Sequence, residues 1–326
     1  MTQPVLSVRD LRVEFPTRSG TLVAVDGVSL DIAPGEILGV VGESGAGKSM
    51  TGMAVLGLLE PPGRIAAGEV RLAGARIDNL DERGLERVRG REIGAIFQDP
   101  LTSLNPVLSI GDQLVETIRV HTRCDRRTAR EQAVAALTAV GIPAPTTRID
   151  HFPHQFSGGM RQRVVIALAL CANPKLVIAD EPTTALDVSI QAQITALLKR
   201  LCKEHGTAVM LITHDMGVIA ETADRVAVMY AGRLAEVGPV LDVIREPRHP
   251  YTRGLMGSIP SLRSRVDELV QIDGSMPRLD RMPPGCAFHP RCPDAGPRCA
   301  RERPDPHPVG TGAVACWLEQ GGVNGG

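Results

Sequence analysis

The chain is predicted to be an α/β protein with a phosphate-binding loop between a strand and a helix, and three observations support this fold class. Residues 42–49 read GESGAGKS and stand between the apolar run 36–41 and the helix-like run 50–56. Residues 175–182 form a second buried-type strand that ends in two acids. Short apolar strands and amphipathic helical patterns fill the chain around them, which is typical of a sheet covered by helices.

The glycine loop is the clearest functional signal in the chain. Its glycines let backbone N–H groups face phosphate oxygens, and the helix that follows presents its positive dipole end. Lys48 adds a full charge, and the Ser49 hydroxyl is a suitable Mg²⁺ ligand. We therefore predict a nucleotide site on Gly42, Glu43, Ser44, Gly45, Ala46, Gly47, Lys48, Ser49 and Met50. The alternative is a glycine turn that joins a strand to a helix and binds nothing.

Composition narrows the class of protein. With 326 residues, 43% of them apolar, the chain can form one large domain or two smaller ones. Its net charge of -1, with basic residues dispersed, argues against a nucleic-acid partner. No apolar run approaches ~20 residues, and the first fifteen residues lack a signal-peptide core, so we expect a cytoplasmic location. In that compartment seven cysteines are normally thiols or metal ligands.

Residues 5–40 alternate in polarity as strands do, with turns at Ser19-Gly20 and Pro34-Gly35. They predict an antiparallel β lobe ahead of the glycine loop. Phe15 is one of only eight aromatic residues in the chain. A lone Phe in a strand is often part of a core, but one near a nucleotide site can stack on adenine, and both interpretations remain open here.

A small helical subdomain is predicted over about 106–172. Residues 110–119 and 128–140 both have the spacing of amphipathic helices. Residues 156–163 read FSGGMRQR and precede a strongly helix-forming stretch. Ser157 is suited to cap that helix, while Gly158 and Gly159 expose N–H groups to an anion.

Polar residues at strand ends supply the candidate catalytic groups. Gln98 follows the strand 93–97 and opens an irregular, proline-containing loop, where it could reach Mg²⁺ or a water, although an ordinary surface loop is the alternative. Asp180 suits the Mg²⁺ coordination sphere, and Glu181 suits a base that polarises the attacking water. His214 follows the strand 208–213 and by itself is more often incidental than functional.

The order of these motifs resembles that of the ABC transporter ATPase subunits. The resemblance implies that Gly42 to Ser49 is Walker A, that Ser157 to Met160 is the signature, and that Asp180 is the Walker B acid. It further implies the following roles: Gln98 for the Q-loop, Glu181 for the catalytic glutamate, Asp187 for the D-loop, His214 for the switch histidine and Phe15 for the adenine-stacking aromatic. The signature reads FSGGM instead of the commoner LSGGQ, but the anion-binding serine and glycines are kept.

Closer similarity is to the D-type ATPases of dipeptide and oligopeptide importers. The stretches that carry it are 97–106, 156–164 and His249-Pro250-Tyr251-Thr252. This implies a peripheral protein on the cytoplasmic face of the inner membrane, which works with a second ATPase, commonly a related F-type chain. It also implies two membrane-spanning permease subunits and an extracytoplasmic peptide-binding protein. A nickel or glutathione importer is an alternative, and a soluble ABC ATPase acting on nucleic acid or ribosomes is a remote one.

The resemblance divides the chain into a nucleotide-binding domain, 1–245, and a C-terminal extension, 246–326. The extension is rich in proline, arginine and glycine and holds Cys286, Cys292, Cys299 and Cys316. Because it has little apolar material for a core, we expect a metal to clamp its loops. The tail resembles the cysteine-rich tail of dipeptide-importer ATPases that carries a [4Fe-4S] cluster. Zinc, with His289 as a spare ligand, and unliganded thiols or a disulfide are the alternatives.

Overall fold

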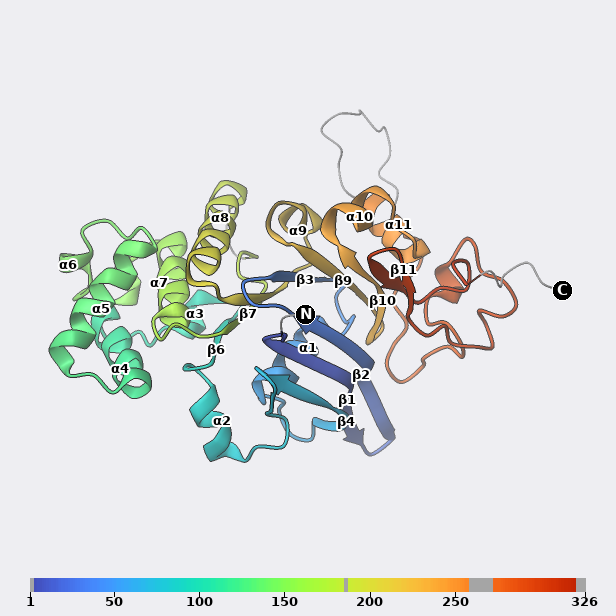
Figure 1. The fold of residues 1–326 in the computed structure, drawn as a ribbon, viewed down its shortest axis with the longest axis horizontal. Coiled ribbons are helices and arrows are strands. Elements are labelled where there is room, and N and C mark those ends of the chain that lie inside the picture. The colour runs from blue at the N-terminus through green and yellow to red at the C-terminus, as the bar shows by residue number, and fades with distance from the viewer. Residues whose placement is uncertain (1–2, 185–186, 258–271, 321–326) are drawn as a thin grey trace. The chain divides into compact units, whose positions relative to one another are not determined.

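The computed structural model describes residues 3–184, 187–257 and 272–320. They form two compact units, each assembled from separate stretches of the chain (Figure 1). The first unit takes residues 1–6, 32–37 and 73–211, and the second takes 7–31, 38–72 and 212–326. Each unit is described by itself below.

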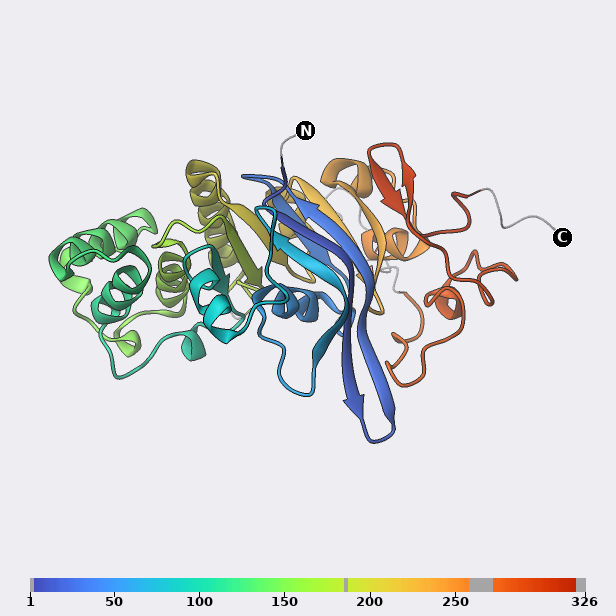
Figure 2. The same ribbon diagram turned by 60° about the horizontal axis from the view of Figure 1, so that its bottom comes forward.

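The second unit contains a long β-hairpin, blue in Figure 2. Strand β1 (Leu6–Thr17) is joined to β2 (Gly20–Ile32) by a two-residue turn at Arg18 and Ser19. Strand β4 (Arg64–Leu72) lies on the other side of β1. The sequence predicted separate short strands here, but each strand of the hairpin is continuous, and the one proline in the pair, Pro16, stands next to the end of β1.

The phosphate-loop strand lies in the second unit's other sheet, in the order β11-β12-β10-β9-β3. Strand β3 (Ile37–Val41) runs parallel to β9 (Arg225–Tyr230), with Leu38 opposite Arg225 and Val41 opposite Val228. Every residue of β3 is buried, as expected for a strand covered on both faces. The antiparallel strands that complete this sheet are β10 (Arg233–Pro239), β11 (His307–Val309) and β12 (Gly312–Val314).

The helices of the second unit are short. Helix α1 (Lys48–Leu56) begins directly after the glycine loop and ends at Gly57, which adopts the left-handed conformation that commonly terminates helices. The others are α9 (Met216–Thr222), α10 (Val240–Arg245), α11 (Pro250–Gly257) and the 3₁₀ turn η2 (His289–Arg291).

The strands of the first unit carry the acidic pair. Strand β7 (Leu176–Asp180) lies between β8 (Ala208–Ile212) and β6 (Ile93–Ile96). It pairs parallel with β6, with Ile93 opposite Leu176 and Ile96 opposite Ala179. Gly94 allows β6 to approach the backbone of Ala169 closely, because a Cβ at Gly94 would lie 2.3 Å from the Ala169 carbonyl oxygen. A short β5 (Ala75–Arg76) also belongs to this unit.

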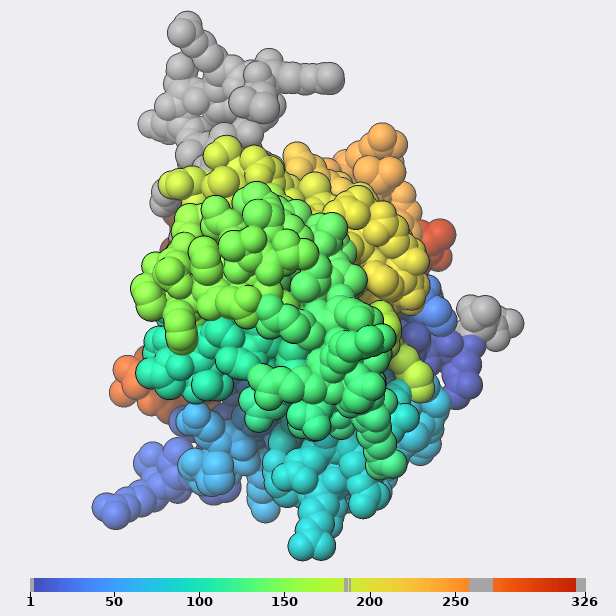
Figure 3. Space-filling view, turned by 90° about the vertical axis from the view of Figure 1, so that its left-hand side faces the viewer, coloured from blue at the N-terminus to red at the C-terminus, as the bar shows by residue number. Residues whose placement is uncertain are grey.

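The first unit also contains a group of helices whose starts the sequence explains. Helix α4 (Ile110–Thr122) is capped by the Ser109 hydroxyl, which accepts from the Asp112 N–H at 3.0 Å, and α5 (Arg126–Ala139) is capped by Asp125. The remaining helical segments are α2 (Glu82–Val88), α3 (Pro100–Ser103), α6 (Pro145–Arg148), η1 (Pro153–Gln155), α7 (Gly158–Leu170) and α8 (Val188–His205). The green surface in Figure 3 belongs to this group. Val120 of α4 is 66% exposed, which is normal for a single apolar side chain.

The loop after Gln98 is more regular than predicted. Asp99 accepts a hydrogen bond from the Leu101 N–H at 2.8 Å, and Pro100 stands at the first helical position, so one turn of helix forms at α3. None of the helices in the described ranges is both long enough and apolar enough to cross a bilayer.

An ion cluster joins three separate stretches of the second unit. The Asp26 carboxylate on β2 accepts hydrogen bonds from Arg12 at 2.6 Å, from Arg233 Nε at 3.0 Å and from Arg303 at 3.1 Å. Burial tends to raise the pKa of Asp26, but bonding to Arg233 and the charges of Arg303 and Arg12 outweigh it, so this pKa lies below its usual value. The charged form is therefore the one that the fold stabilises.

Replacing this carboxylate should destabilise the second unit. We expect Asp26→Asn to lower the free energy of unfolding by about 2 kcal/mol at neutral pH, because three arginines lose an anionic acceptor. The lowered pKa means that the contribution is complete above the unfolded value of about 3.9 and disappears as the pH falls through the folded value. Urea unfolding at neutral and acidic pH measures both effects. Asp150→Asn, in an exposed pair with Arg130, is the control, and an equal loss there would contradict the account.

Candidate functional site

The glycine loop closes around the side chain of Lys48. The Lys48 Nζ donates to the carbonyl oxygens of Gly42 at 2.8 Å and Glu43 at 3.0 Å, and the side chain is buried. The loop is drawn in further by a bond from the Ala46 N–H to the Glu43 carbonyl at 3.1 Å. Ser49 and Met50 occupy the first turn of α1, directly after Lys48. A closed loop at a helix start, with a lysine inside it, is the geometry expected of a phosphate cradle.

Two of the loop glycines are required by close backbone approach. A Cβ on Gly42 would lie 2.2 Å from the Met229 carbonyl oxygen of β9, and one on Gly47 would lie 2.7 Å from the Ala24 carbonyl oxygen of β2. Gly45, by contrast, has a positive φ of 83° but no atom nearer than the Met276 sulfur at 3.9 Å. The conformation of the loop thus depends on strands that lie far from it in the sequence.

The predicted catalytic acid and the predicted Q-loop residue meet in the first unit. Gln98 Nε2 donates to the Glu181 carboxylate at 3.2 Å, and the Thr184 hydroxyl donates to the same oxygen at 2.8 Å. Glu181 has a φ of +46°, a conformation that costs a non-glycine residue roughly 1–2 kcal/mol. Backbone strain of this kind is often found at functional positions. Asp180 is the last residue of β7 and directly precedes it.

The signature residues stand at the start of helix α7, in the same unit. Ser157 is the N-cap, and its hydroxyl accepts from the Met160 N–H at 3.4 Å. Gly158 and Gly159 form the first turn, and a Cβ on Gly159 would lie 2.8 Å from the Ile190 side chain of α8. A helix of thirteen residues therefore begins with a capping hydroxyl and two glycines, and the positive end of its dipole suits an anion.

The three remaining predicted residues lie near element ends. Asp187 is the exposed residue before α8, and its side chain makes no cap bond. His214 is exposed in the turn between β8 and α9, where its neighbour Asp215 caps α9 by accepting from the Gly217 N–H at 2.7 Å. Phe15 is half-buried near the end of β1, and its ring lies against Gly63.

Sequence reasoning missed how the C-terminal extension contacts the glycine loop. The Tyr251 hydroxyl accepts from the Glu43 N–H at 2.8 Å, and Arg291 forms an ion pair with the Glu43 carboxylate at 3.0 Å. More than two hundred residues separate these partners along the chain. The only sequence signal was the segment His249-Pro250-Tyr251-Thr252, which indicated a family but not a contact.

The predicted [4Fe-4S] cluster on Cys286, Cys292, Cys299 and Cys316 is wrong. Within the described ranges, no group of three or more His, Cys, Asp and Glu side chains is arranged to hold a metal ion, so zinc is not supported either. All four of these cysteines are free thiols. Burial raises the pKa of Cys286 and Cys316, and raises that of Cys292 to about 11. Burial thus favours the protonated thiol at these three cysteines.

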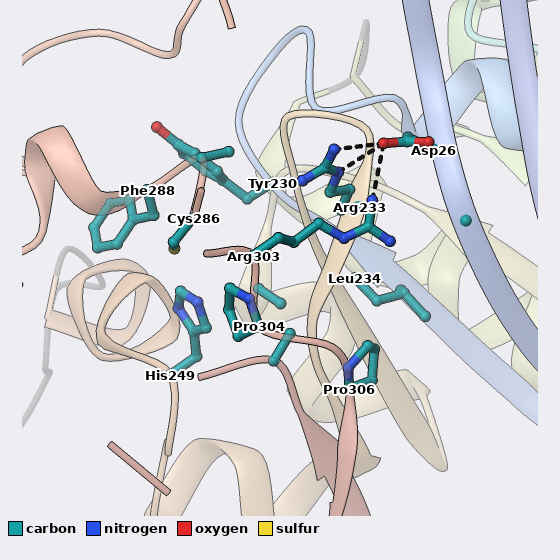
Figure 4. Close-up of a pocket in the computed structure, with 14 residues that line it drawn as sticks. Asp26, Tyr230, Arg233, Leu234, His249, Cys286, Phe288, Arg303, Pro304 and Pro306 are labelled. Carbon is teal, nitrogen blue, oxygen red and sulfur yellow. Dashed lines mark hydrogen bonds and ion pairs between the residues drawn. The ribbon is translucent and has the colours of Figure 1, made fainter. Parts of the chain in front are cut away.

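The extension has an aromatic core instead of a metal clamp (Figure 4). Tyr230 packs edge-on against Tyr251, with ring centroids 4.6 Å apart, and against Phe288 at 5.2 Å. His249 is buried beside them, and burial lowers its pKa to about 4, so it is neutral at physiological pH. The adjoining cavity holds about 50 Å³, enough for a few waters but not for a nucleotide base. Aromatic packing of this kind supplies the stabilisation that a metal was expected to provide.

A second contact holds the end of the extension. The Arg298 guanidinium lies 3.4 Å from the centroid of the Trp317 ring, and the Trp317 indole N–H donates to the Glu302 carbonyl oxygen at 3.1 Å. A guanidinium over an indole contributes roughly 0.5–2 kcal/mol. The single tryptophan of the chain thus anchors the segment that contains Cys299 and Cys316.

Two family models match the chain. The model described as ABC transporter matches residues 25–184, and the model described as oligopeptide/dipeptide transporter, C-terminal region, matches residues 235–299. The first match contains the glycine loop, the FSGGM segment and the acidic pair. The second contains Tyr251 and Arg291, which contact that loop.

Relatives and solved structures agree with these matches. The dipeptide transport ATP-binding protein DppD of Bacillus subtilis (strain 168) is 48% identical and covers 97% of this chain and 95% of its own length. The oligopeptide transport ATP-binding protein OppD of Salmonella typhimurium is 49% identical over 92% of this chain and 89% of its own length. The dimeric structure of MJ0796, a bacterial ABC transporter cassette, superposes with a TM-score of 0.64 at 29% identity, covering 72% of this chain and 98% of that one. The predicted α/β fold class is thereby confirmed.

The close backbone approach at Gly42 can be tested by its effect on stability. We expect Gly42→Ala to lower the free energy of unfolding of the nucleotide-free protein by about 3 kcal/mol, because the new methyl group overlaps the Met229 carbonyl. Gly45→Ala is the matched control, since it carries the same kind of positive φ in open space and should cost only about 1 kcal/mol. Chemical denaturation measures both losses. Equal destabilisation by the two variants would show that the close approach at Gly42 is unimportant.

Proposed function

Because this chain belongs to the ABC transporter family, among the ATP-binding subunits of dipeptide and oligopeptide transporters, we propose that it hydrolyses ATP to power import of di- or oligopeptides. The observation that carries the proposal is similarity to peptide-transport subunits along nearly the whole chain. The match to the C-terminal region of such transporters supports the choice of peptide, because that model matches residues 235–299, beyond the 25–184 that the ABC transporter model matches.

The glycine loop is assigned to the phosphates of ATP. In this proposal the loop N–H groups and Lys48 hold the phosphate oxygens, while Phe15 stacks on the adenine ring. The oxygen donors of Ser49, Gln98 and Asp180 fit the preferences of Mg²⁺ and would hold it, directly or through water. When bound, Mg²⁺ neutralises charge on the phosphate groups. Lys48 now donates to two loop carbonyls, and phosphate oxygens would take over those bonds.

Glu181 is assigned to the attacking water. Its carboxylate accepts hydrogen bonds from Gln98 and Thr184, which hold it in one orientation, and in this proposal it accepts a proton from the attacking water. The positive φ at Glu181 supports this role, because a strained backbone is maintained here at the end of a buried strand. His214 is proposed to contact the γ-phosphate region as the switch residue, from the turn after β8.

The start of helix α7 is assigned to the ATP of a partner ATPase. Ser157, Gly158 and Gly159 would bind the γ-phosphate held on the partner's glycine loop, so that ATP closes the pair and phosphate release opens it. Asp187, exposed before α8, would lie at the same interface. The partner is proposed to be a related F-type chain.

Transport requires chains other than this one. We propose two membrane-spanning permease subunits, an extracytoplasmic peptide-binding protein, and a peripheral position for this subunit on the cytoplasmic face of the inner membrane. We assign the contact with the permease to the loop after Gln98. Leu101 on α3, in this loop, is an apolar side chain that is 61% exposed and could pack against a permease subunit. Closure of the ATPase pair would be transmitted to the permease through this loop.

Removing the base should separate binding from turnover. We expect Glu181→Gln to retain ATP and form a stable pair with its partner ATPase, with turnover reduced by roughly two decades or more, because a positioned base is lost. Phosphate release measures turnover, and size-exclusion chromatography with ATP measures formation of the pair. Glu204→Gln, on the exposed face of α8, is the control and should hydrolyse ATP at the wild-type rate. Normal turnover in Glu181→Gln would remove this residue from its assigned role.

Removing the loop lysine should act at the earlier step of binding. We expect Lys48→Ala to weaken nucleotide binding by at least tenfold, because a charged hydrogen-bond donor to the phosphates disappears. Titration with a fluorescent ADP analogue measures this constant without turnover. An affinity equal to that of the wild type would count against a phosphate site at residues 42–49.

A further inference from the structure

The side chain of Arg291 lies at the centre of the contact between the C-terminal extension and the glycine loop. It is only 7% exposed, and its ion pair with Glu43 spans 3.0 Å. Its guanidinium also lies 5.8 Å from the Tyr230 ring centroid and 6.0 Å from that of Phe288. A buried guanidinium is stable only when its N–H donors are hydrogen-bonded, so the acceptors of Arg291 show which segments it holds together.

All five N–H donors of this guanidinium have an acceptor. Two bond the side chains of Glu43 and Tyr230, the latter at 3.3 Å. The other three bond backbone carbonyl oxygens of Asp273 at 2.8 Å, Ile272 at 3.2 Å and Gly274 at 3.4 Å. Arg291 therefore ties the glycine loop to β9 and to the segment 272–274 at once. A lysine has only three donors and lacks the planar fork that reaches these acceptors together.

Tyr251 holds the same loop residue from a second direction. Its side chain is fully buried, and its hydroxyl oxygen accepts the Glu43 N–H at 2.8 Å. Burial raises the pKa of Tyr251, so the hydroxyl stays neutral at physiological pH. Both the backbone N–H and the carboxylate of Glu43 are thus bonded to residues beyond 246, outside the ATPase core.

Glu43 in turn determines where Lys48 and the loop backbone lie. Its carbonyl oxygen accepts from Lys48 Nζ at 3.0 Å and from the Ala46 N–H at 3.1 Å. Fixing Glu43 therefore fixes the strand-side half of the loop, which otherwise consists of flexible glycine and serine residues.

We propose that Arg291 and Tyr251 are positioning residues that preorganise the glycine loop, and that the C-terminal extension thereby sets the affinity of the site for nucleotide. This inference rests on the proposed nucleotide site at residues 42–49. A preorganised loop loses less conformational freedom when phosphate binds, so releasing it weakens binding without removing any group that contacts the nucleotide. The extension then contributes to the free energy of nucleotide binding, although it supplies no phosphate ligand.

The test measures the dissociation constant of a fluorescent ADP analogue for full-length variants. We expect Arg291→Gln to weaken binding by about tenfold and to raise the ATP KM by a similar factor, with kcat changed less than threefold. Arg298→Gln is the matched control, because Arg298 lies in the same extension and packs on Trp317 without contacting the loop. Its affinity should stay within twofold of the wild type.

A double-mutant cycle with Glu43→Gln separates positioning from general destabilisation. Because Arg291 acts through Glu43, the double variant should bind no more weakly than the weaker single variant. If Arg291→Gln does not fold, Tyr251→Phe replaces it, since it removes one oxygen atom and should weaken binding at least threefold. The proposal would be overturned if the Arg291→Gln or Tyr251→Phe variant bound the analogue within twofold of the wild type. It would also be overturned if Arg298→Gln lost as much affinity as Arg291→Gln, or if the losses in the cycle were fully additive.

Lys48→Ala, measured in the same titration, tells this proposal apart from the assignment of the site itself. Weak binding by Lys48→Ala with unchanged binding by the Arg291 and Tyr251 variants would overturn the positioning role alone. Wild-type binding by Lys48→Ala would overturn the nucleotide site at this loop, and the positioning proposal with it.

Discussion

The glycine loop depends on one close backbone approach, at Gly42. Here strand β3 ends and the loop begins, packed against the Met229 carbonyl of β9. No side chain fits at this position, since a Cβ would lie 2.2 Å from that oxygen. The approach is possible because β3 and β9 are parallel neighbours, which brings the loop beside the end of β9. Once the loop is held there, Lys48 can be enclosed by its own backbone carbonyls, and helix α1 starts with its N-terminus facing the same region. The chemistry assigned to the loop follows from this packing constraint.

Local patterns in the sequence predicted the elements that carry the site. The strand, loop and helix around Lys48, the cap at Ser157 and the buried strand before Glu181 all appear where spacing and capping rules place them, because each depends on neighbours within a few residues. The contact between Glu43 and Arg291 could not be predicted, since it joins residues 248 apart and neither residue is unusual in its own segment. The one-turn helix at Pro100 was missed because two prolines in nine residues suggested an irregular loop.

The error at the cysteines has a physical explanation. Four thiols within 31 residues suggested a metal because the segment has little apolar material of its own for a core. Three aromatic rings and a neutral, buried histidine pack together instead, two of the rings and the histidine coming from residues outside the cysteine-rich stretch. Cys286 lines the cavity beside Tyr230, His249 and Phe288, and burial raises the pKa of its thiol. The extension is therefore stabilised by packing and by the buried Arg291, whose bonds lead to the glycine loop.

The central claim is that ATP hydrolysis by this chain drives peptide import. It is tested most directly by reconstituting the chain with its partner ATPase and permease subunits in vesicles, with the solute-binding protein on the outside and ATP inside, and measuring uptake of a labelled dipeptide or oligopeptide. The account predicts uptake that requires ATP and stops when Glu181→Gln replaces the wild-type chain. Peptide uptake that continues with that variant, or ATP-driven uptake of nickel or glutathione with none of any peptide, would contradict it.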